Sequence, residues 1–167
     1  MAVADLVGAA VGVLLLILVA YILVGSTLST AEIVTNAQKA VTLQEQTQLR
    51  TDFAINNITT ATIIDGNNDY AFNCTIKNTG KEIISDFQHM DVIAYDGLTI
   101  FQLYTFNSDN EVVIPGTWTI VDKGNEIIHK SELDPGESYT IMVTTSGISP
   151  YWFQITTANG AFASNLL

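Results

Sequence analysis

The stretch from Leu6 to Leu28, LVGAAVGVLLLILVAYILVGSTL, contains no charged residue. Its central part, from Val11 to Ala20, is almost purely aliphatic. A helix needs about 20 consecutive apolar residues to cross the hydrocarbon part of a bilayer, so this segment is long enough to span a membrane. A cleaved secretory signal would begin with basic residues and carry a shorter apolar run. The sequence therefore predicts a membrane-spanning helix within residues 1–28.

Length and charge limit what the rest of the chain can be. The 167 residues leave room for one domain besides the anchor. Six Lys and Arg residues stand against 17 Asp and Glu residues, which gives a formal net charge of -11. The field of such a domain repels a phosphate backbone, so nucleic acid is excluded as a partner. An acidic surface instead favours solubility, high-salt surroundings, cation-rich surfaces or a basic protein partner, and the net charge does not choose among these.

Small residues near the start of the apolar segment suggest a helix-packing site. Gly8 and Gly12 form a G-x-x-x-G pair, which lets a second helix backbone approach closely in lipid. The same pattern also occurs in anchors that pack against nothing, and both interpretations stay open. Asp5 precedes the segment, where we expect it to cap the helix, with an ion pair to a neighbouring subunit's amino terminus as the alternative.

Residues 29–51 continue as a polar helix. No Gly or Pro occurs between Ser29 and Arg50, and a weak apolar stripe runs along this stretch. The stripe consists of Ile33, Ala37, Ala40, Val41 and Leu49. This segment is therefore either a stalk in solvent or one half of a contact with another subunit.

After Arg50 the pattern changes from helical to alternating, and β-branched and aromatic residues dominate. About seven or eight short strands separated by turn residues are typical of an antiparallel sandwich of immunoglobulin-like type, with a small barrel as the alternative. The expected strands are Asp52–Ile64, Tyr70–Lys77, Asp91–Tyr95, Leu98–Phe106, Trp118–Val121, Ser138–Thr145, Tyr151–Thr157 and a short one after Gly160. The predicted fold class is thus α+β, with an all-β domain over residues 52–167.

The sequence offers little catalytic chemistry. It has no nucleophile elbow, P-loop, dinucleotide fingerprint or zinc-protease helix, and the single cysteine, Cys74, reads as an inert buried thiol. His89 and His129 each lack a second His or Cys at ligand spacing. The loop Asp65–Asp69 matches the first three ligand positions of a calcium loop but lacks its Gly and its twelfth-position Glu, so a plain turn is expected. We predict no catalytic residue, metal, cofactor or small-molecule substrate.

Two features suggest an external domain and a partner surface. Asn57-Ile58-Thr59 and Asn73-Cys74-Thr75 are acceptor sequons for N-linked glycans. Four aromatic residues form a candidate interaction surface, although burial within the sandwich is the competing interpretation. They are Trp118, Tyr151, Trp152 and Phe153.

The order of an uncharged helix, a polar helix and a β-sandwich resembles the archaeal flagellin (archaellin) superfamily, and in particular the archaellar accessory proteins F and G. Several short motifs in a fixed order carry the resemblance, which spans most of the chain. They are Asn78-Thr79-Gly80, Asp86-Phe87, Met90-Asp91-Val92, Leu133-Asp134-Pro135-Gly136-Glu137 and Thr157-Ala158-Asn159-Gly160.

The resemblance implies a non-enzymatic structural component of the archaeal motility apparatus. It implies a stator-type subunit anchored in the cell membrane, whose β domain lies in the pseudoperiplasm and contacts the S-layer protein or sister subunits. Filament subunits of that superfamily carry a short basic leader that a peptidase removes, whereas no Lys or Arg precedes Lys39 here. Either the leader is absent, as in the uncleaved accessory type, or it has been trimmed. The filament subunit is therefore the first alternative. A membrane-tethered receptor or carbohydrate-binding module that uses the four aromatic residues is the alternative from another class.

Overall fold

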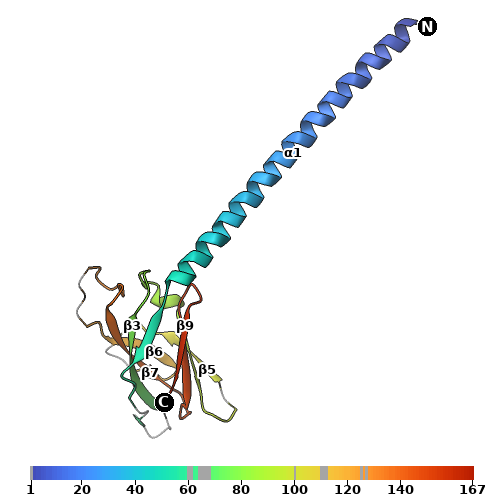
Figure 1. Cartoon of the computed structure of the whole chain (residues 1–167). Coiled ribbons are helices and arrows are strands. Elements are labelled where there is room, and N and C mark those ends of the chain that lie inside the picture. Colours follow the sequence, from blue (N-terminus) through green and yellow to red (C-terminus); the bar gives the residue numbers. More distant parts are fainter. Residues whose placement is uncertain are drawn as a thin grey trace. The chain divides into compact units, whose positions relative to one another are not determined.

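The computed structural model describes residues 2–59, 62–63, 69–99, 101–109, 113–124, 126 and 128–167. It opens with one continuous helix, α1 (Ala2–Arg50), followed by β-strands (Figure 1). The chain divides into two compact units, residues 1–44 and residues 45–167. The last turn of α1 thus belongs to the same unit as the strands. Of the predicted plain turn Asp65–Asp69, only Asp69 is among the described residues, and the side chain of Asp5 lies outside them.

The first unit is helical, and its described side chains from Leu6 to Leu28 are all exposed. Among the residues that the structure describes, one helix is long and apolar enough to cross a membrane, and its candidate span begins at Leu6. Two threonine hydroxyl groups bond within the helix: Thr27 Oγ1 donates to the Leu23 carbonyl oxygen at 3.0 Å, and Thr30 Oγ1 to that of Ser26 at 2.9 Å. Such bonds satisfy a hydroxyl group where no water is present.

The second unit contains nine described strands and one 3-10 turn, and the strand positions follow the alternation of the sequence. The elements are β1 (Phe53–Asn56), β2 (Thr62–Ile63), β3 (Tyr70–Asn78), η1 (Phe87–His89), β4 (Asp91–Tyr95), β5 (Phe101–Phe106), β6 (Thr117–Asp122), β7 (Ser138–Thr144), β8 (Trp152–Thr156) and β9 (Phe162–Leu166). The predicted first strand, Asp52–Ile64, is divided at Asn57, whose φ of 49° leaves the extended region.

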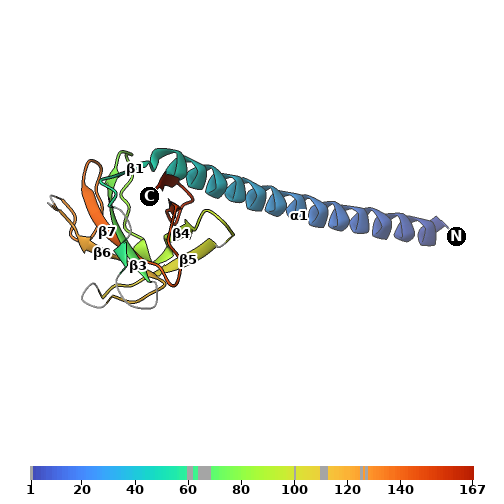
Figure 2. The same cartoon turned by 90° about the horizontal axis from the view of Figure 1, so that it is seen from below.

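Two layers of strands face each other. One layer contains β1, β2, β3, β7 and β6, and the other contains β5, β4, β8 and β9 (Figure 2). The pairs within each layer are antiparallel, as predicted. A short parallel contact between β5 and β6, at Thr105↔Thr117 and Phe106↔Trp118, joins the layers along one side. The sandwich thus has one continuous strand order, β1-β3-β7-β6-β5-β4-β8-β9, which gives it some barrel character.

The core lies between the layers and is filled by alternate residues of each strand. Phe72 of β3 meets Phe153 of β8, with ring centroids 4.9 Å apart. Cys74, next on the inner face of β3, is fully buried, and burial raises the pKa of its thiol to about 12. A thiol that stays protonated and enclosed does not react, as the sequence predicted. The domain thus completes its own core without a disulfide.

Candidate functional site

The short motifs between Asn78 and Gly160 meet at one end of the sandwich, around the last turn of α1. We call the contacts of residues 45–52 with these motifs the helix-end junction. The junction contains three backbone hydrogen bonds. The Arg50 carbonyl oxygen accepts from Lys81 N at 2.8 Å, and the Asp52 carbonyl oxygen accepts from Thr79 N and Gly80 N. The helix thus ends directly on a loop of the domain.

Gly80 is required at the junction because the backbone of Arg50 and Asp52 leaves no space for a side chain. A Cβ atom at this position would lie 2.5 Å from the Asp52 nitrogen and 2.6 Å from the Arg50 carbonyl oxygen. Both atoms belong to the backbone and cannot rotate away. An ion pair supports the same contact, since Arg50 Nε lies 2.8 Å from Glu82 Oε1. The Asn78-Thr79-Gly80 motif therefore has a structural role, which is to let the helix end approach the domain closely.

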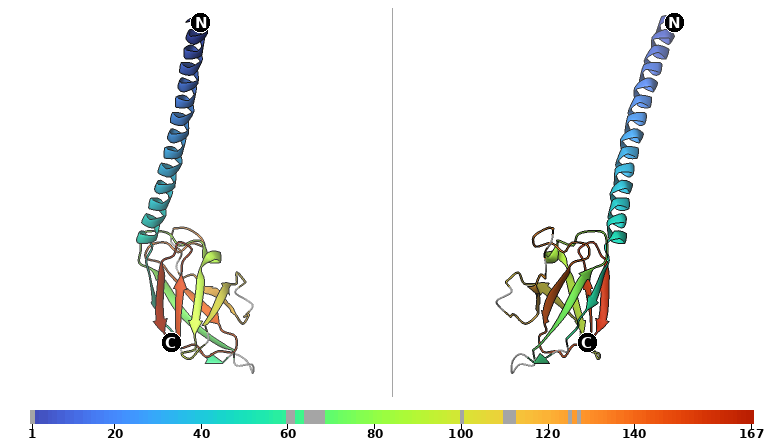
Figure 3. Two further views of the ribbon diagram at one scale, coloured as in Figure 1. Left: turned by 90° about the vertical axis from the view of Figure 1, so that its right-hand side faces the viewer. Right: turned by 60° about the vertical axis from the view of Figure 1, so that its left-hand side comes forward.

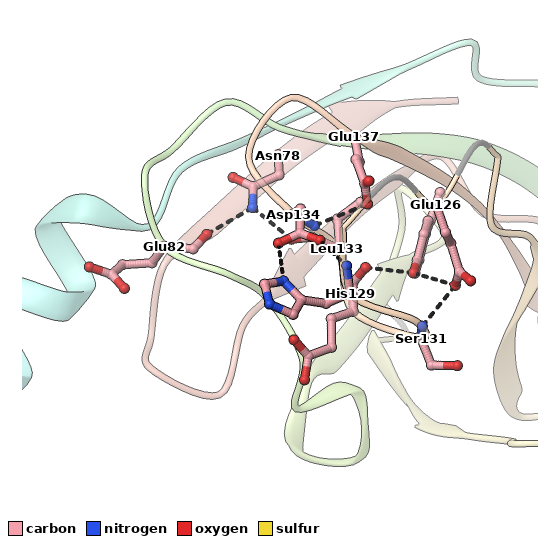
Figure 4. Close-up of polar contacts among 10 residues, drawn as sticks. Asn78, Glu82, Glu126, His129, Ser131, Leu133, Asp134 and Glu137 are labelled. Atoms are coloured by element: carbon pink, nitrogen blue, oxygen red, sulfur yellow. Dashed lines mark hydrogen bonds and ion pairs between the residues drawn. The ribbon is translucent and has the colours of Figure 1, made fainter.

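Asn78 joins this loop to the turn at Leu133–Glu137. Its side chain is fully buried, and its Nδ2 donates to the carbonyl oxygens of Glu82 and Leu133, each at 2.8 Å (Figure 4). Its backbone nitrogen donates to the Glu137 carbonyl oxygen at 3.0 Å. Its carbonyl oxygen accepts from Gly136 N at 2.8 Å. Two motifs that lie far apart in the sequence are thus held together by one buried amide and its own backbone.

An acid-base pair closes the same turn. Asp134 is 2% exposed, and its carboxylate accepts from the backbone nitrogen of His129 and lies 2.9 Å from His129 Nδ1. This hydrogen bond and the charge of the carboxylate raise the pKa of His129 above its ordinary value. The hydrogen bond from His129 is also the main cause that lowers the pKa of Asp134. The contact therefore favours the protonated imidazole beside the ionised carboxylate.

A second carboxylate anchors the segment before this turn. Glu126 Oε1 accepts from Ser131 N and from the Tyr139 hydroxyl group, each at 2.9 Å. The bond from the Ser131 backbone is the main cause that lowers the pKa of Glu126. The Tyr139 hydroxyl group also lies 2.7 Å from the Glu132 carbonyl oxygen. These contacts hold the loop between β6 and β7 in place.

The turn Thr157–Gly160 completes the junction from the other layer. Asn159 Nδ2 donates to Thr51 Oγ1 at 2.6 Å, and Asn159 Oδ1 accepts from Thr157 Oγ1 at 2.6 Å. Asp86, from another motif, accepts from the His89 backbone nitrogen and so caps η1. Each of these motifs therefore stabilises a turn of the domain.

The predicted helix-packing residues lie apart from this junction. The structure places nothing within 4 Å of the Cβ positions at Gly8 and Gly12. Both positions are open along the helix surface. Packing of a second helix there stays a prediction.

The two sequons differ in exposure. Asn57 is exposed in the loop after β1, whereas Asn73 is half-buried in β3, between β7 and the β1–β2 segment. The Thr59 hydroxyl group lies 2.8 Å from the Asn73 backbone nitrogen, from which it accepts. Attachment of glycans at either Asn stays a prediction, with Asn57 the more accessible of the two.

The prediction of an aromatic interaction surface is wrong for two of its four members. Trp118 is 1% exposed and Phe153 is 0% exposed, because both side chains point between the layers. Trp118 packs against Phe106, with ring centroids 4.7 Å apart. Tyr151 and Trp152 do reach the surface. The aromatic platform expected of a carbohydrate-binding module is therefore not formed by this set.

Sequence reasoning missed other exposed apolar residues, namely Leu98, Phe101 and Leu103 in and before β5. Phe101, Leu103 and Thr105 alternate along one face of β5, and this pattern could have identified the exposed face. Tyr104 and Phe106, on the opposite face of the same strand, are also large and apolar. The sequence of the strand therefore does not show which of the two faces is buried.

No group of three or more His, Cys, Asp or Glu residues that could hold a metal ion occurs among the residues that the structure describes. His89 and His129 lie beside Asp86 and Asp134, respectively, rather than beside each other. Each histidine is thus paired with a single neighbouring aspartate in these two contacts.

Comparison with known proteins places the chain in a family. The family model of the archaeal-type flagellin matches residues 7–165. Two solved structures share 21% and 24% identity with TM-scores of 0.46: the archaellum periplasmic stator protein complex FlaF and FlaG, and the stator protein FlaG, both from Sulfolobus acidocaldarius. They cover 69% and 70% of this chain and 87% and 99% of their own. No curated protein matches the chain. Since the family match spans nearly the whole sequence, the chain belongs to the archaeal-type flagellin family and is a component related to the archaellum.

Proposed function

We propose that the chain is an accessory subunit of the archaellum, of stator type, anchored in the cell membrane by residues 6–28. Its β domain lies outside the membrane and contacts an envelope protein, such as the S-layer, or sister subunits of the same machine. The role is structural: the domain binds a partner, while the helix anchors the chain in the bilayer. It needs no catalytic group.

One observation carries the proposal: the apolar part of α1 is exposed on all sides, and the same helix continues into the helix-end junction. A helix that is apolar all round requires lipid or a bundle of other helices. At the junction, Thr51 N donates to the carbonyl oxygens of Thr47 and Gln48, so the last turn of the helix closes directly before β1. A helix that leads directly into the β domain suits a subunit that connects a membrane with an external partner.

The filament subunit remains the second candidate, because the matched family includes flagellins and the match covers the apolar helix. In that case residues 6–28 would pack among copies of the same helix in the filament core. The stripe Ile33, Ala37, Ala40 and Val41 would extend this packing. Both candidates are archaellum components, and they differ in what surrounds the helix.

The test uses protein from the native host. The intact mass and the N-terminal sequence of the protein from the membrane fraction are measured, and sheared surface filaments are examined by electron microscopy and mass spectrometry. Retention in the membrane fraction with no copies along the filament supports the accessory role. Abundant copies along the filament would overturn the proposal in favour of the filament subunit.

A further inference from the structure

One row of apolar side chains crosses the outer face of the layer β5-β4-β8-β9. Phe101 lies opposite Tyr95, Tyr95 opposite Trp152, and Trp152 opposite Leu166 in the strand register. Opposed residues of antiparallel strands point to the same face. Since Ala94 and Phe153 are fully buried on the inner face, their neighbours in this row point outward.

The side chains of this row pack against each other and are exposed. The rings of Tyr95 and Phe101 stack with centroids 4.3 Å apart and planes inclined by 18°. Phe101 is 64% exposed and Leu166 is 54% exposed, so the row is open to the surroundings. Strands lie about 4.8 Å apart, so four strands make a row about 14 Å wide.

Neighbouring residues extend the row into a patch. Leu103 of β5 and Ile93 of β4 form part of the next row on the same face. We call these six residues the apolar patch: Ile93, Tyr95, Phe101, Leu103, Trp152 and Leu166. An exposed apolar patch of this extent on an otherwise acidic domain is typical of a protein-binding site.

The patch lies far from the helix-end junction. β8 begins with Trp152 in the patch and leads to the turn at Thr157–Gly160, which contacts Thr51. Figure 3 shows the C-terminus, next to Leu166, at the end of the sandwich opposite the last turn of α1. The patch is therefore separated from the helix end by the length of the strands.

The charges around the patch indicate which partner surface would complement it. No Lys or Arg occurs between Lys81 and Lys123 or after Lys130, so none of the strands β4, β5, β8 and β9 carries a basic residue. Asp91 is exposed on the same face, at the start of β4, and Asp96 lies in the turn after it. The chain as a whole carries a formal net charge of -11. The patch is thus apolar with an acidic border.

We propose that this patch binds a different protein, one that presents apolar side chains bordered by Lys or Arg. A second copy of this chain fits less well, because a symmetric contact would bring Asp91 and Asp96 of both copies together under two fields of the same sign. The inference rests on the accessory role only for the identity of the partner class, an external protein of the same apparatus or envelope.

The experiment places the photoreactive amino acid benzoylphenylalanine at Leu103 of the full-length protein in the native host. The matched control carries it at Thr140, which lies on the outer face of the other layer, since its neighbours Tyr139 and Ile141 are buried. Native membranes are irradiated at about 0.1 M and about 1 M salt, between which the Debye length falls from about 10 Å to about 3 Å. Cross-linked peptides are identified by mass spectrometry.

We expect Leu103 to cross-link to a peptide of another protein that contains Lys or Arg, with at least tenfold less product from Thr140. We also expect the product to fall severalfold at high salt and in the variant Asp91→Lys. The double variant Phe101→Ser/Leu103→Ser, whose native side chains are exposed, should lose affinity at least tenfold for the identified partner without changing the membrane localisation of the chain.

Four results would overturn the proposal: a cross-link to a second copy of the chain, a cross-link only to lipid, equal products from both positions, or no product at Leu103. The accessory role would survive all four results, because it is tested by membrane retention and by the composition of the filament.

Discussion

Asn159 and Thr51, 108 residues apart, share the shortest link of the helix-end junction, a hydrogen bond of 2.6 Å from Asn159 Nδ2 to Thr51 Oγ1. The Thr51 hydroxyl group in turn donates to the Thr47 carbonyl oxygen in the last turn of α1 at 2.9 Å. One hydroxyl group thus connects the helix end to the turn before β9. The connection makes the orientation of the last helical turn part of the fold of the β domain.

Thr51→Val should destabilise the domain by about 1–2 kcal/mol, because it removes both bonds and leaves the half-buried Asn159 amide without this partner. The measurement is thermal unfolding of the full chain in detergent. Thr42→Val is the control, since the Thr42 hydroxyl group bonds only to the Gln38 carbonyl oxygen in the structure's described contacts. Equal melting temperatures for the two variants would contradict the role assigned to Thr51.

Gly80→Ala should cost at least about 2 kcal/mol, because the added Cβ would collide with two backbone atoms of Arg50 and Asp52. Gly116→Ala is the comparison: its Cβ would meet open space, and only its φ of 84° opposes the substitution, at about 1 kcal/mol. Denaturant unfolding of both variants separates a collision from backbone strain. If Gly116→Ala proved the more damaging, the close approach at Gly80 would not be the reason for this glycine.

The His129–Asp134 pair should make stability depend on pH. The pKa of His129 is raised above its ordinary 6.5, so its contribution is complete below pH 6.5 and is lost as the pH rises through the raised value. The pKa of Asp134 is lowered below its ordinary 3.8, so its contribution is lost as the pH falls through that lower value. The pair therefore stabilises most between pH 3.8 and 6.5.

The difference in melting temperature between the native chain and His129→Gln should be greatest in that window and should shrink above it. Asp134→Asn removes the same charged bond from the other side and should reproduce the profile. A difference that stays constant with pH would show that the two side chains act only through shape.

Gly12→Leu should weaken association of the apolar helix with another helix, because the bulky side chain would close the surface that Gly8 and Gly12 leave open. Gly25→Leu is matched, since Gly25 also has open space but no glycine four residues away. Recovery of native complexes in mild detergent measures the effect, with membrane insertion unchanged in both. Equal recovery of both variants would favour a featureless anchor.

Asn57 should carry a glycan more fully than Asn73, because Asn57 is exposed in a loop and Asn73 is half-buried in a central strand. Thr59→Ala removes the first sequon, while Thr59→Ser keeps both the sequon and a hydroxyl group to accept from Asn73 N. Glycopeptide masses from the native host give the occupancy. A glycan that is still present in Thr59→Ala would be attached to a residue other than Asn57.

Much of the architecture was predictable from local patterns. The uncharged run at Leu6–Leu28 determined the apolar helix, because a helix satisfies all backbone hydrogen bonds within one continuous apolar segment. Alternation and turn residues located most of the strands within a few positions. The pattern Phe72, Cys74 and Ile76 also predicted the buried face of β3, since a strand's side chains alternate strictly between its two faces.

The tertiary structure decided which residues of a strand point inward and which strands are neighbours, because the alternation of residue types leaves both open. Trp152 and Phe153 are neighbours of similar size, and only the pairing of β8 with β4 determined that Phe153 points inward and Trp152 outward. The parallel contact between β5 and β6 is likewise a result of how the two layers close. The convergence of Asn78, Asp134 and Asn159 on one end of the sandwich depends on contacts between residues far apart in the chain. A sequence fixes spacing along the chain, whereas these properties are set by which strands become neighbours in space.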